Sequence, residues 1–255
     1  MKIAVLMKDV PDLVEDLELT DEGQLAVDEL SFIPSEWDDQ ALEEALLVKD
    51  EMGQAEVTAV AVDTGDVDSM LYTALAKGAD RAVKIVGEFG RDLPNRARSA
   101  VLAEYLKTAG YDLILTGVQA IDDVDGQVAG LVAGHLDVPH ASVVREVAVA
   151  GGHVRCLQEY SAGRMAELRL ATPALLGIQA ARKPPRYVTI AKVRQVTKSA
   201  SLEEVEGELP EVPTAAVRRL FKPQAAGRAV MWEGDPEAVA EQIVALLDDR
   251  KLIRS

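Results

Sequence analysis

The 255-residue chain combines 48% hydrophobic residues with only 4% aromatic residues and a formal net charge of −16. This composition is typical of an α/β protein with an aliphatic core and excludes a disordered chain, while the acidity argues against the basic face that a nucleic-acid-binding protein needs. No apolar run approaches the roughly 20 residues of a membrane span, and Asp9 comes too early for a secretory leader, so we expect a cytoplasmic protein without membrane insertion. One cysteine, Cys156, and three scattered histidines predict neither an internal disulfide nor a metal site.

Strands and helices are expected to alternate over the first 139 residues. Short apolar runs predict buried strands at 2–7, 56–62, 81–86 and 113–115, and helical spacing predicts helices at 40–52, 67–77, 95–108 and from 127 onward. This alternation is typical of an α/β fold with a doubly wound, mostly parallel sheet. In such a sheet the carboxyl ends of the strands carry the ligand, so the loops after Met7, Val62 and Leu115 should lie along one binding edge.

The region before the second strand carries more detailed expectations. Residues 17–27 place an Asp-Glu-Gly turn between apolar flanks, which predicts a β-hairpin. Asp38 or Asp39 is expected to cap the helix at 40–52, and Trp37, just ahead of it, either packs onto the first turn or turns its ring to a planar ligand. The charged residues of this helix that we expect to face water are Glu43, Glu44, Lys49 and Asp50.

A candidate phosphate site follows the strand at 113–115. Thr116 and Gly117 lead into a polar turn, which ends where the next helix begins at about Gln127. A turn with glycine beside a helix N-terminus groups backbone N–H groups at the positive end of the helix dipole, which is how α/β proteins hold a nucleotide phosphate. The pattern is neither a Walker loop nor a GxGxxG fingerprint, so an ordinary strand-turn-helix unit is the alternative. Lys8 is correspondingly either an anion contact or an exposed lysine.

The pattern changes beyond Pro139. Alternating segments separated by glycine-containing turns predict an antiparallel meander at 141–171, and an apolar run predicts one more strand of the main sheet at 174–178. From Ser199 to Gly227 the chain is rich in proline and charge with little periodicity, which predicts an arm lying on a partner. Residues 235–249 predict a final amphipathic helix.

Positive charge is concentrated within the segment 182–194 of this acidic protein. The basic residues are Arg182, Lys183, Arg186, Lys192 and Arg194. They either balance nearby acids or, in a proline-containing loop that ends in an exposed apolar residue, form a docking element for another protein.

Five segments together resemble one known family. They are VLMKDVPD at 5–12, ALEEA at 41–45, TALAKGADRAV at 73–83, DLILTGVQAIDD at 112–123 and PPRYVTIAKV at 184–193. In this combination the chain, up to about Val193, resembles the β subunit of the electron transfer flavoproteins. The resemblance implies an adenine-nucleotide α-hydrolase-like fold with an extended C-terminal arm, and an electron carrier subunit without substrate chemistry of its own rather than an enzyme.

The resemblance also implies cofactors and partners. Proteins of this family pair with an α subunit, whose redox FAD the β subunit helps to enclose, and the β subunit itself binds AMP or, in electron-bifurcating members, a second FAD. The heterodimer shuttles electrons between flavin dehydrogenases and a quinone reductase or other acceptor. Since residues 125–128 read partly like the bifurcating group, AMP is the first expectation and FAD the alternative. A nucleotide-binding regulator or hydrolase of similar fold is the alternative of another class, and the PRYxT segment and the long arm disfavour it.

Carried over by position, the family's functional contacts lie on a small number of segments. The cofactor-binding positions are Leu6, Lys8, Leu13, Ser35, Trp37, Asp38, Val62, Asp63, Thr64, Gly117, Gln119, Ala120, Asp122, Asp123, Asp125, Gly126, Gln127 and Val128. Among these, Leu13 and Trp37 match positions near the flavin ring. The partner-binding positions are Arg186, Tyr187, Thr189, Ile190 and Lys192. Ile190 aligns with a leucine that the family inserts into the dehydrogenase; packing in the core of the loop is the alternative.

These expectations divide the chain into two parts. Residues 1–198 are expected to form an α/β nucleotide-binding domain, which includes the meander at 141–171 and a partner-recognition loop at 182–194. Residues 199–255 are expected to form an arm and helix that pack on the α subunit.

Overall fold

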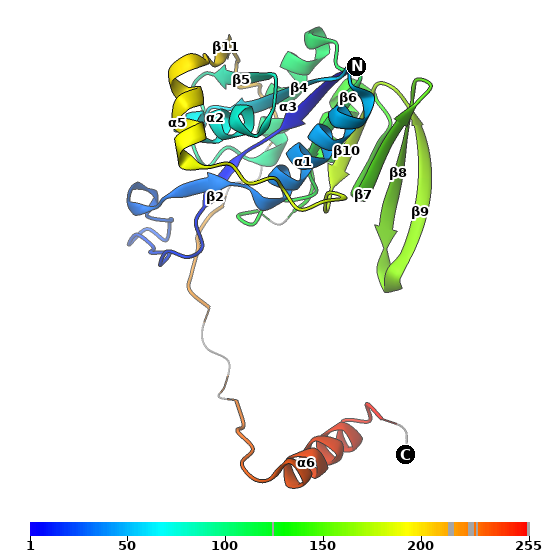
Figure 1. Ribbon diagram of the computed structural model, residues 1–255. Coiled ribbons are helices and arrows are strands. Elements are labelled where there is room, and N and C mark those ends of the chain that lie inside the picture. Colours follow the sequence, from blue (N-terminus) through cyan, green and yellow to red (C-terminus); the bar gives the residue numbers. More distant parts are fainter. Residues whose placement is uncertain (124, 214–216, 224–226, 228, 254–255) are drawn as a thin grey trace.

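The computed structural model describes residues 1–123, 125–213, 217–223, 227 and 229–253. Within them, a main sheet of nine strands crosses the molecule with helices on both faces (Figure 1). From edge to edge its strands are β11 (Glu203–Glu206), β5 (Arg81–Val86), β4 (Glu56–Val62), β1 (Lys2–Leu6), β6 (Leu113–Gly117), β10 (Ala174–Ile178), β7 (His140–Ala150), β8 (His153–Tyr160) and β9 (Arg164–Ala171). Strands β11 to β7 run parallel, and β7, β8 and β9 form an antiparallel meander. The predicted doubly wound, mostly parallel sheet with an antiparallel insertion is confirmed.

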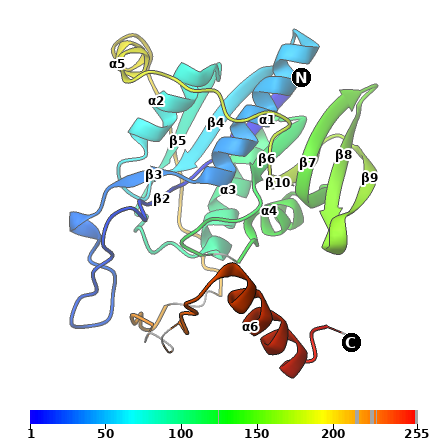
Figure 2. The same cartoon turned by 60° about the horizontal axis from the view of Figure 1, so that its bottom comes forward.

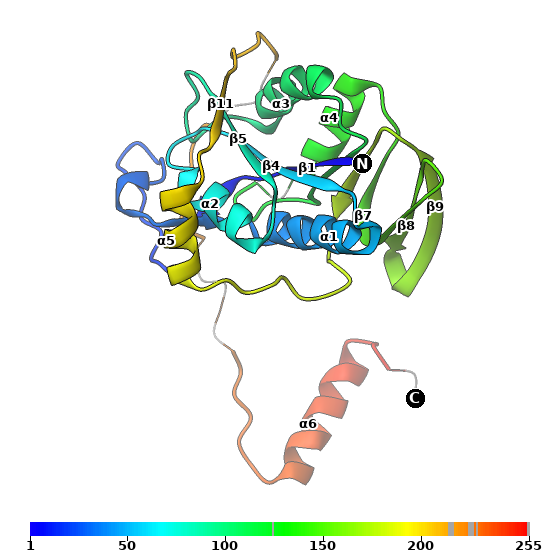
Figure 3. The same cartoon turned by 45° about the horizontal axis from the view of Figure 1, so that its top comes forward.

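Two hydrophobic layers sandwich the parallel part of the sheet. Helices α1 (Glu36–Met52) and α2 (Asp68–Lys77) cover one face, and α3 (Asn95–Ala109) and α4 (Val128–Leu136) cover the other (Figure 3). Because successive residues of a strand point to opposite faces, Ile3 and Val5 of β1 pack under α1, whereas Ala4 and Leu6 pack under α3 and α4. In the described part of the chain, no helix is long and apolar enough to cross a bilayer.

The order of the strands shows where the crossover direction reverses. The chain moves from β1 to β4 and β5 in one direction and then returns to β6, on the other side of β1. The crossover direction therefore reverses between β1 and β6, where Leu6 lies beside Thr116. In open α/β sheets, ligands bind at the carboxyl ends of the strands at such a reversal point.

The N-terminal region differs from the sequence prediction in two places. The β-hairpin expected at 17–27 forms only in part: one antiparallel bridge joins Leu19 to Leu25, with backbone hydrogen bonds from Thr20 to Gln24 and from Ala26 to Glu18, and a short 3₁₀ turn, η1 (Val27–Glu29), follows. The local strand pairing lies outside that segment instead, between β2 (Asp9–Pro11) and β3 (Phe32–Pro34). An isolated two-stranded hairpin is marginal in water, and none of the residues that flank the 17–27 turn is buried.

Helix α1 begins at Glu36, four residues earlier than predicted. Ser35 occupies its N-cap position, so Trp37 lies within the first turn rather than ahead of it. The capping role expected for Asp38 or Asp39 is also wrong, since both residues are already helical. Three acids in the first turn favour the early start, because negative charge is stabilising at the positive end of a helix dipole.

The expectation that Glu43 and Glu44 face water is wrong as well. Glu43 is 4% exposed and Glu44 is completely buried. Each is paired with an arginine of the segment after β10: Glu44 Oε1 lies 2.8 Å from Arg182 Nε, and Glu43 Oε2 lies 3.0 Å from Arg186 Nε. A carboxylate tolerates burial when a guanidinium compensates its charge, and these partners are 138 and 143 residues away along the chain.

The C-terminal part contains more regular structure than the sequence predicted. Helix α5 (Ile190–Ser199) packs beside α2, and β11 joins the main sheet parallel to β5, so the arm begins after β11 rather than at Ser199. A 3₁₀ turn, η2 (Ser161–Gly163), joins β8 to β9. The final helix, α6 (Pro236–Asp249), has no buried residue and lies apart from the sheet (Figure 2).

Candidate functional site

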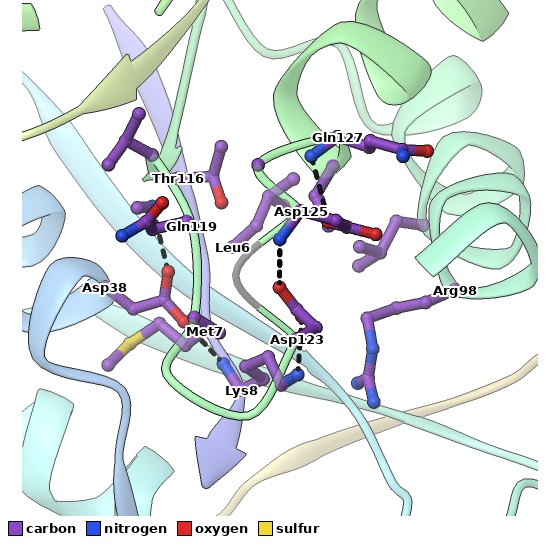
Figure 4. A pocket seen from close by; sticks show the side chains of 16 residues that line it. Leu6, Met7, Lys8, Asp38, Arg98, Thr116, Gln119, Asp123, Asp125 and Gln127 are labelled. Atoms are coloured by element: carbon purple, nitrogen blue, oxygen red, sulfur yellow. Dashed lines mark hydrogen bonds and ion pairs between the residues drawn. The ribbon is translucent and has the colours of Figure 1, made fainter. Parts of the chain in front are cut away.

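A pocket opens at the reversal point of the sheet, between the ends of β1 and β6 (Figure 4). It contains about 390 Å³ of empty space, counting its open mouth. Its lining residues are Leu6, Met7, Lys8, Asp38, Arg98, Leu102, Thr116, Gly117, Val118, Gln119, Ala120, Asp123, Asp125, Gly126, Gln127 and Val128. The loop after β1, the start of α1 and the segment from β6 to α4 thus meet at one place.

Asp38 links two of the segments that line the pocket. One carboxylate oxygen accepts the backbone N–H of Gly117 at 2.8 Å, and the other accepts that of Lys8 at 2.9 Å. The side chain is only 5% exposed, and burial raises the pKa of Asp38 to about 7 although the two N–H donors oppose the shift. The first turn of α1 is therefore tied to the loops after β1 and β6.

Gly117 makes the close approach of β6 to α1 possible. A Cβ atom at this position would lie 2.6 Å from Asp38 Oδ1 and 2.7 Å from Trp37 Cβ. The sequence therefore needs glycine here for steric reasons, and the predicted importance of Gly117 has a packing basis.

The side chain of Lys8 forms ion pairs with two neighbouring aspartates. Its Nζ lies 2.8 Å from both carboxylate oxygens of Asp122 and 3.1 Å from Asp123. Both partners stand on the turn after β6, so Lys8 fastens this turn to the loop after β1. The two carboxylates therefore largely compensate the charge of the Lys8 ammonium group.

The turn ahead of α4 is ordered by its own acids. The backbone N–H of Asp125 donates to Asp123, that of Gln127 donates to Asp125, and the Asn95 amide donates to Asp125 at 2.7 Å. Gly126 has a φ of +62°, a left-handed conformation that favours glycine. These contacts fix the conformation of the turn that leads into α4.

Helix α4 has no side-chain cap. Within the described residues, the backbone N–H groups of Val128, Ala129 and Gly130 donate no hydrogen bond. The first N–H groups of any helix lack intrahelical partners, and the dipole adds partial positive charge there. The N-terminus of α4 thus offers donors at the pocket wall to which Gln127 and Val128 belong.

Arg98 is the charged residue of the pocket that the sequence analysis missed. It is 5% exposed in the apolar face of α3, and its Nε has no hydrogen-bond partner among the described residues. Burial lowers the pKa of Arg98, and the surrounding acids, Asp122 first, oppose that shift. A basic residue among Ala97, Val101 and Leu102 on the buried stripe of the predicted helix was the available signal.

The pocket contains most of the predicted cofactor positions but not all of them. The predicted residues that line it are Leu6, Lys8, Asp38, Gly117, Gln119, Ala120, Asp123, Asp125, Gly126, Gln127 and Val128. The remaining predicted positions do not line it: Leu13, Ser35, Trp37, Val62, Asp63, Thr64 and Asp122. Besides Arg98, the pocket adds Met7, Leu102, Thr116 and Val118.

The predicted positions outside the pocket have different surroundings. Asp122 lines a wider cleft that adjoins the pocket and shares Lys8 and Arg98 with it. Val62 and Thr64 are buried at the end of β4, and Trp37 lies against Gly117. Leu13 is exposed on the loop after β2.

The predicted partner segment is fastened to α1 by its arginines. Arg186 binds Glu43 and Asp50 through its guanidinium, so this residue holds the segment in place. Thr189 caps α5, its hydroxyl oxygen accepting the backbone N–H of Lys192 at 3.2 Å. Tyr187, between these two anchors, is 85% exposed, and Ile190, directly after Thr189, is 69% exposed, so the alternative of Ile190 as a core residue is wrong for this chain.

Comparison with known proteins identifies the family. A model of the electron transfer flavoprotein domain matches residues 24–210. The electron transfer flavoprotein subunit beta of Methylophilus methylotrophus is 32% identical over 98% of this chain and 99% of its own length. The subunit of the same name from Bacillus subtilis (strain 168) is 31% identical over 97% of each chain, and that of Homo sapiens is 32% identical over 62% of each. The chain, which is similar to β subunits from its first strand to its arm, therefore belongs to the electron transfer flavoprotein family.

Proposed function

We propose that this chain is the β subunit of a heterodimeric electron transfer flavoprotein that shuttles electrons between flavin dehydrogenases and a quinone reductase or another acceptor. The pocket at the reversal point of the sheet is the observation that carries the proposal, because its wall contains the uncapped N-terminus of α4. Such a site suits a nucleotide phosphate. The subunit has no substrate chemistry of its own in this proposal.

The nucleotide proposed for the pocket is AMP, with FAD as the alternative. The phosphate would accept from the N–H groups at the start of α4, and the apolar side chains of Leu6, Met7 and Leu102 line the same pocket. Lys8 would act through the turn that it holds rather than as the main phosphate contact, since Asp122 and Asp123 already engage it.

An α subunit is the proposed partner of the exposed apolar residues at both ends of the chain. Leu13 and Val14 are exposed on the loop after β2, and Phe221, Val230 and Met231 are exposed on the arm. Apolar surface of this kind marks an interface. In this proposal residues 1–198 with β11 form the nucleotide-binding domain, the rest of the arm and α6 pack on the α subunit, and the loop with Leu13 helps to enclose the FAD of that subunit.

Replacing Gly126 by valine should abolish nucleotide retention. A β-branched residue is strained at a φ of +62°, and its Cβ would lie 3.2 Å from the Val118 carbonyl oxygen, so the turn that starts α4 would move. The measurement is the amount of AMP and FAD released by denaturing the purified heterodimer. Gly134→Val, in α4 where a Cβ meets nothing within 4 Å, is the control and should retain the nucleotide. Equal retention in both variants would contradict the proposed phosphate site.

Replacing Ile190 by alanine should weaken the reaction with the dehydrogenase about 10- to 100-fold, because burying one such side chain in a partner contributes roughly 1.5–3 kcal/mol. The apparent KM for the heterodimer in reduction by its dehydrogenase reports this loss. Since Ile190 is mostly exposed, the free energy of unfolding should change by no more than about 0.5 kcal/mol. Met165→Ala, an exposed residue of β9, is the control. An unchanged KM for Ile190→Ala would place the anchor elsewhere.

A further inference from the structure

We propose that Arg98 determines the charge of the ligand, so that the pocket takes a nucleoside monophosphate and rejects nucleotides with two or more phosphates. This inference rests on the proposed nucleotide site and decides between its two candidate ligands. Arg98 reaches from α3 beside the turn that carries Asp123 and Asp125 (Figure 4). It lines both the pocket and the adjoining cleft, and so marks their junction.

Arg98 stands out among the basic residues of this region. The described residues that line the pocket and the cleft include three cations, Lys8, Arg91 and Arg98. Lys8 is bound to Asp122 and Asp123, and Arg91 is bound to Asp9 at 2.9 Å and to the Gly65 carbonyl oxygen at 2.7 Å. Arg98 alone of the three has no side-chain hydrogen bond to a described residue, although it is the most buried.

A buried guanidinium without a hydrogen-bonding partner is unfavourable until an anion reaches it. Arg98 and the start of α4 both line the pocket, so a phosphate bound there would have both sets of donors nearby. Charge-assisted bonds to phosphate are the stronger class of hydrogen bond. Arg98 therefore favours a phosphorylated nucleoside over the free nucleoside.

The same geometry opposes further phosphates. Beside Arg98 lies the cleft, whose lining adds Asp92 and Asp122 to Asp123 and Asp125, which also line the pocket. A second phosphate would place its charge among these additional carboxylates, and the other cations of the cleft, Lys8 and Arg91, are already engaged. Like charges in a partly desolvated site repel strongly. ADP, ATP and the pyrophosphate of FAD should for this reason bind more weakly than AMP.

The test uses the heterodimer freed of its nucleotide and titrated with adenosine, AMP, ADP, ATP and FAD. The wild type should bind AMP at least about 10-fold more tightly than each of the others.

Arg98→Gln should weaken AMP binding about 10- to 100-fold and leave adenosine binding unchanged. Arg98→Lys, which keeps the charge but not the planar fork, should lie between the two. Asp122→Asn should improve ADP binding relative to AMP, because it removes a carboxylate and releases Lys8. Arg96→Gln, an exposed arginine of the same helix, is the control.

The outcomes separate this inference from the function on which it rests. A wild type that binds none of the nucleotides overturns the proposed site itself. AMP binding that is equal in the wild type and Arg98→Gln overturns the role of Arg98, and a wild type that binds ADP, ATP or FAD as tightly as AMP overturns the charge limit. If Arg98→Gln does not fold, the comparison of AMP with adenosine and ADP in the wild type, together with Arg98→Lys, still decides the question.

Discussion

Replacing Arg182 by methionine should lower the free energy of unfolding by about 3–5 kcal/mol, since it leaves a buried carboxylate without its compensating charge. Glu44 is completely buried. It also accepts the backbone N–H groups of Val147 at 2.8 Å and of Arg182 at 3.0 Å, and these two bonds remain in the variant. The measurement is the denaturation midpoint of the heterodimer at one fixed protein concentration, since association shifts apparent stability.

The loss should depend on pH. Burial already raises the pKa of Glu44, while the hydrogen bonds and charge of Arg182 oppose that shift, so removing Arg182 raises the pKa further. A carboxyl group whose pKa is higher in the folded state than in the unfolded state contributes stability below its ordinary pKa and loses it as the pH rises through the folded value. Arg182→Met should therefore be more destabilising at pH 8 than at pH 5.

Two further variants make this result specific. The double change Glu44→Gln with Arg182→Met removes the buried charge and keeps an acceptor for Val147, so most of the lost stability should return. Arg155→Met breaks an exposed pair with Glu167 and should cost no more than about 1 kcal/mol. If Arg182→Met costs no more than Arg155→Met, the pair with Glu44 does not hold the segment to α1.

Replacing Gly117 by alanine should lower the free energy of unfolding by about 1–3 kcal/mol and release the nucleotide proposed for the pocket. The added Cβ would lie 2.6 Å from Asp38 Oδ1 and 2.8 Å from the backbone carbonyl carbon of Trp37, so α1 and β6 would have to separate. That movement breaks the bond from the Gly117 N–H to Asp38, which leaves a buried carboxylate with one donor fewer. The measurements are the denaturation midpoint and the nucleotide released from the heterodimer.

Gly134→Ala is the matched control for this change. A Cβ at Gly134 meets nothing within 4 Å, and the residue lies inside α4, where alanine is the better helix former. The control should be neutral or slightly stabilising and should retain its nucleotide. A variant Gly117→Ala with the midpoint and nucleotide content of the control would show that the contact between β6 and α1 adjusts freely.

The sequence by itself determined the alternation of elements and the edge of the sheet at which the pocket opens. Strand β4 and strand β5 occur where the apolar runs predicted them, and the meander follows at β7 to β9. These features depend on periodicity within a few residues of each other, and the order of strand and helix then constrains the sheet. The segments quoted from the sequence were also sufficient to indicate the family.

Only the tertiary structure decided which charged residues are buried. From the pattern of α1 alone, Glu43 and Glu44 are expected on a solvent-facing side of the helix. In the structure they are buried and paired with Arg186 and Arg182, which lie more than 130 residues further along the chain. In the sequence, Arg98 is only one basic residue in an apolar stripe. In the structure it lies among aspartates and lines the same pocket as the N-terminus of α4. A local sequence pattern depends only on residues that are close along the chain. Whether a charge can be buried depends on a partner that only the folded structure brings close to it.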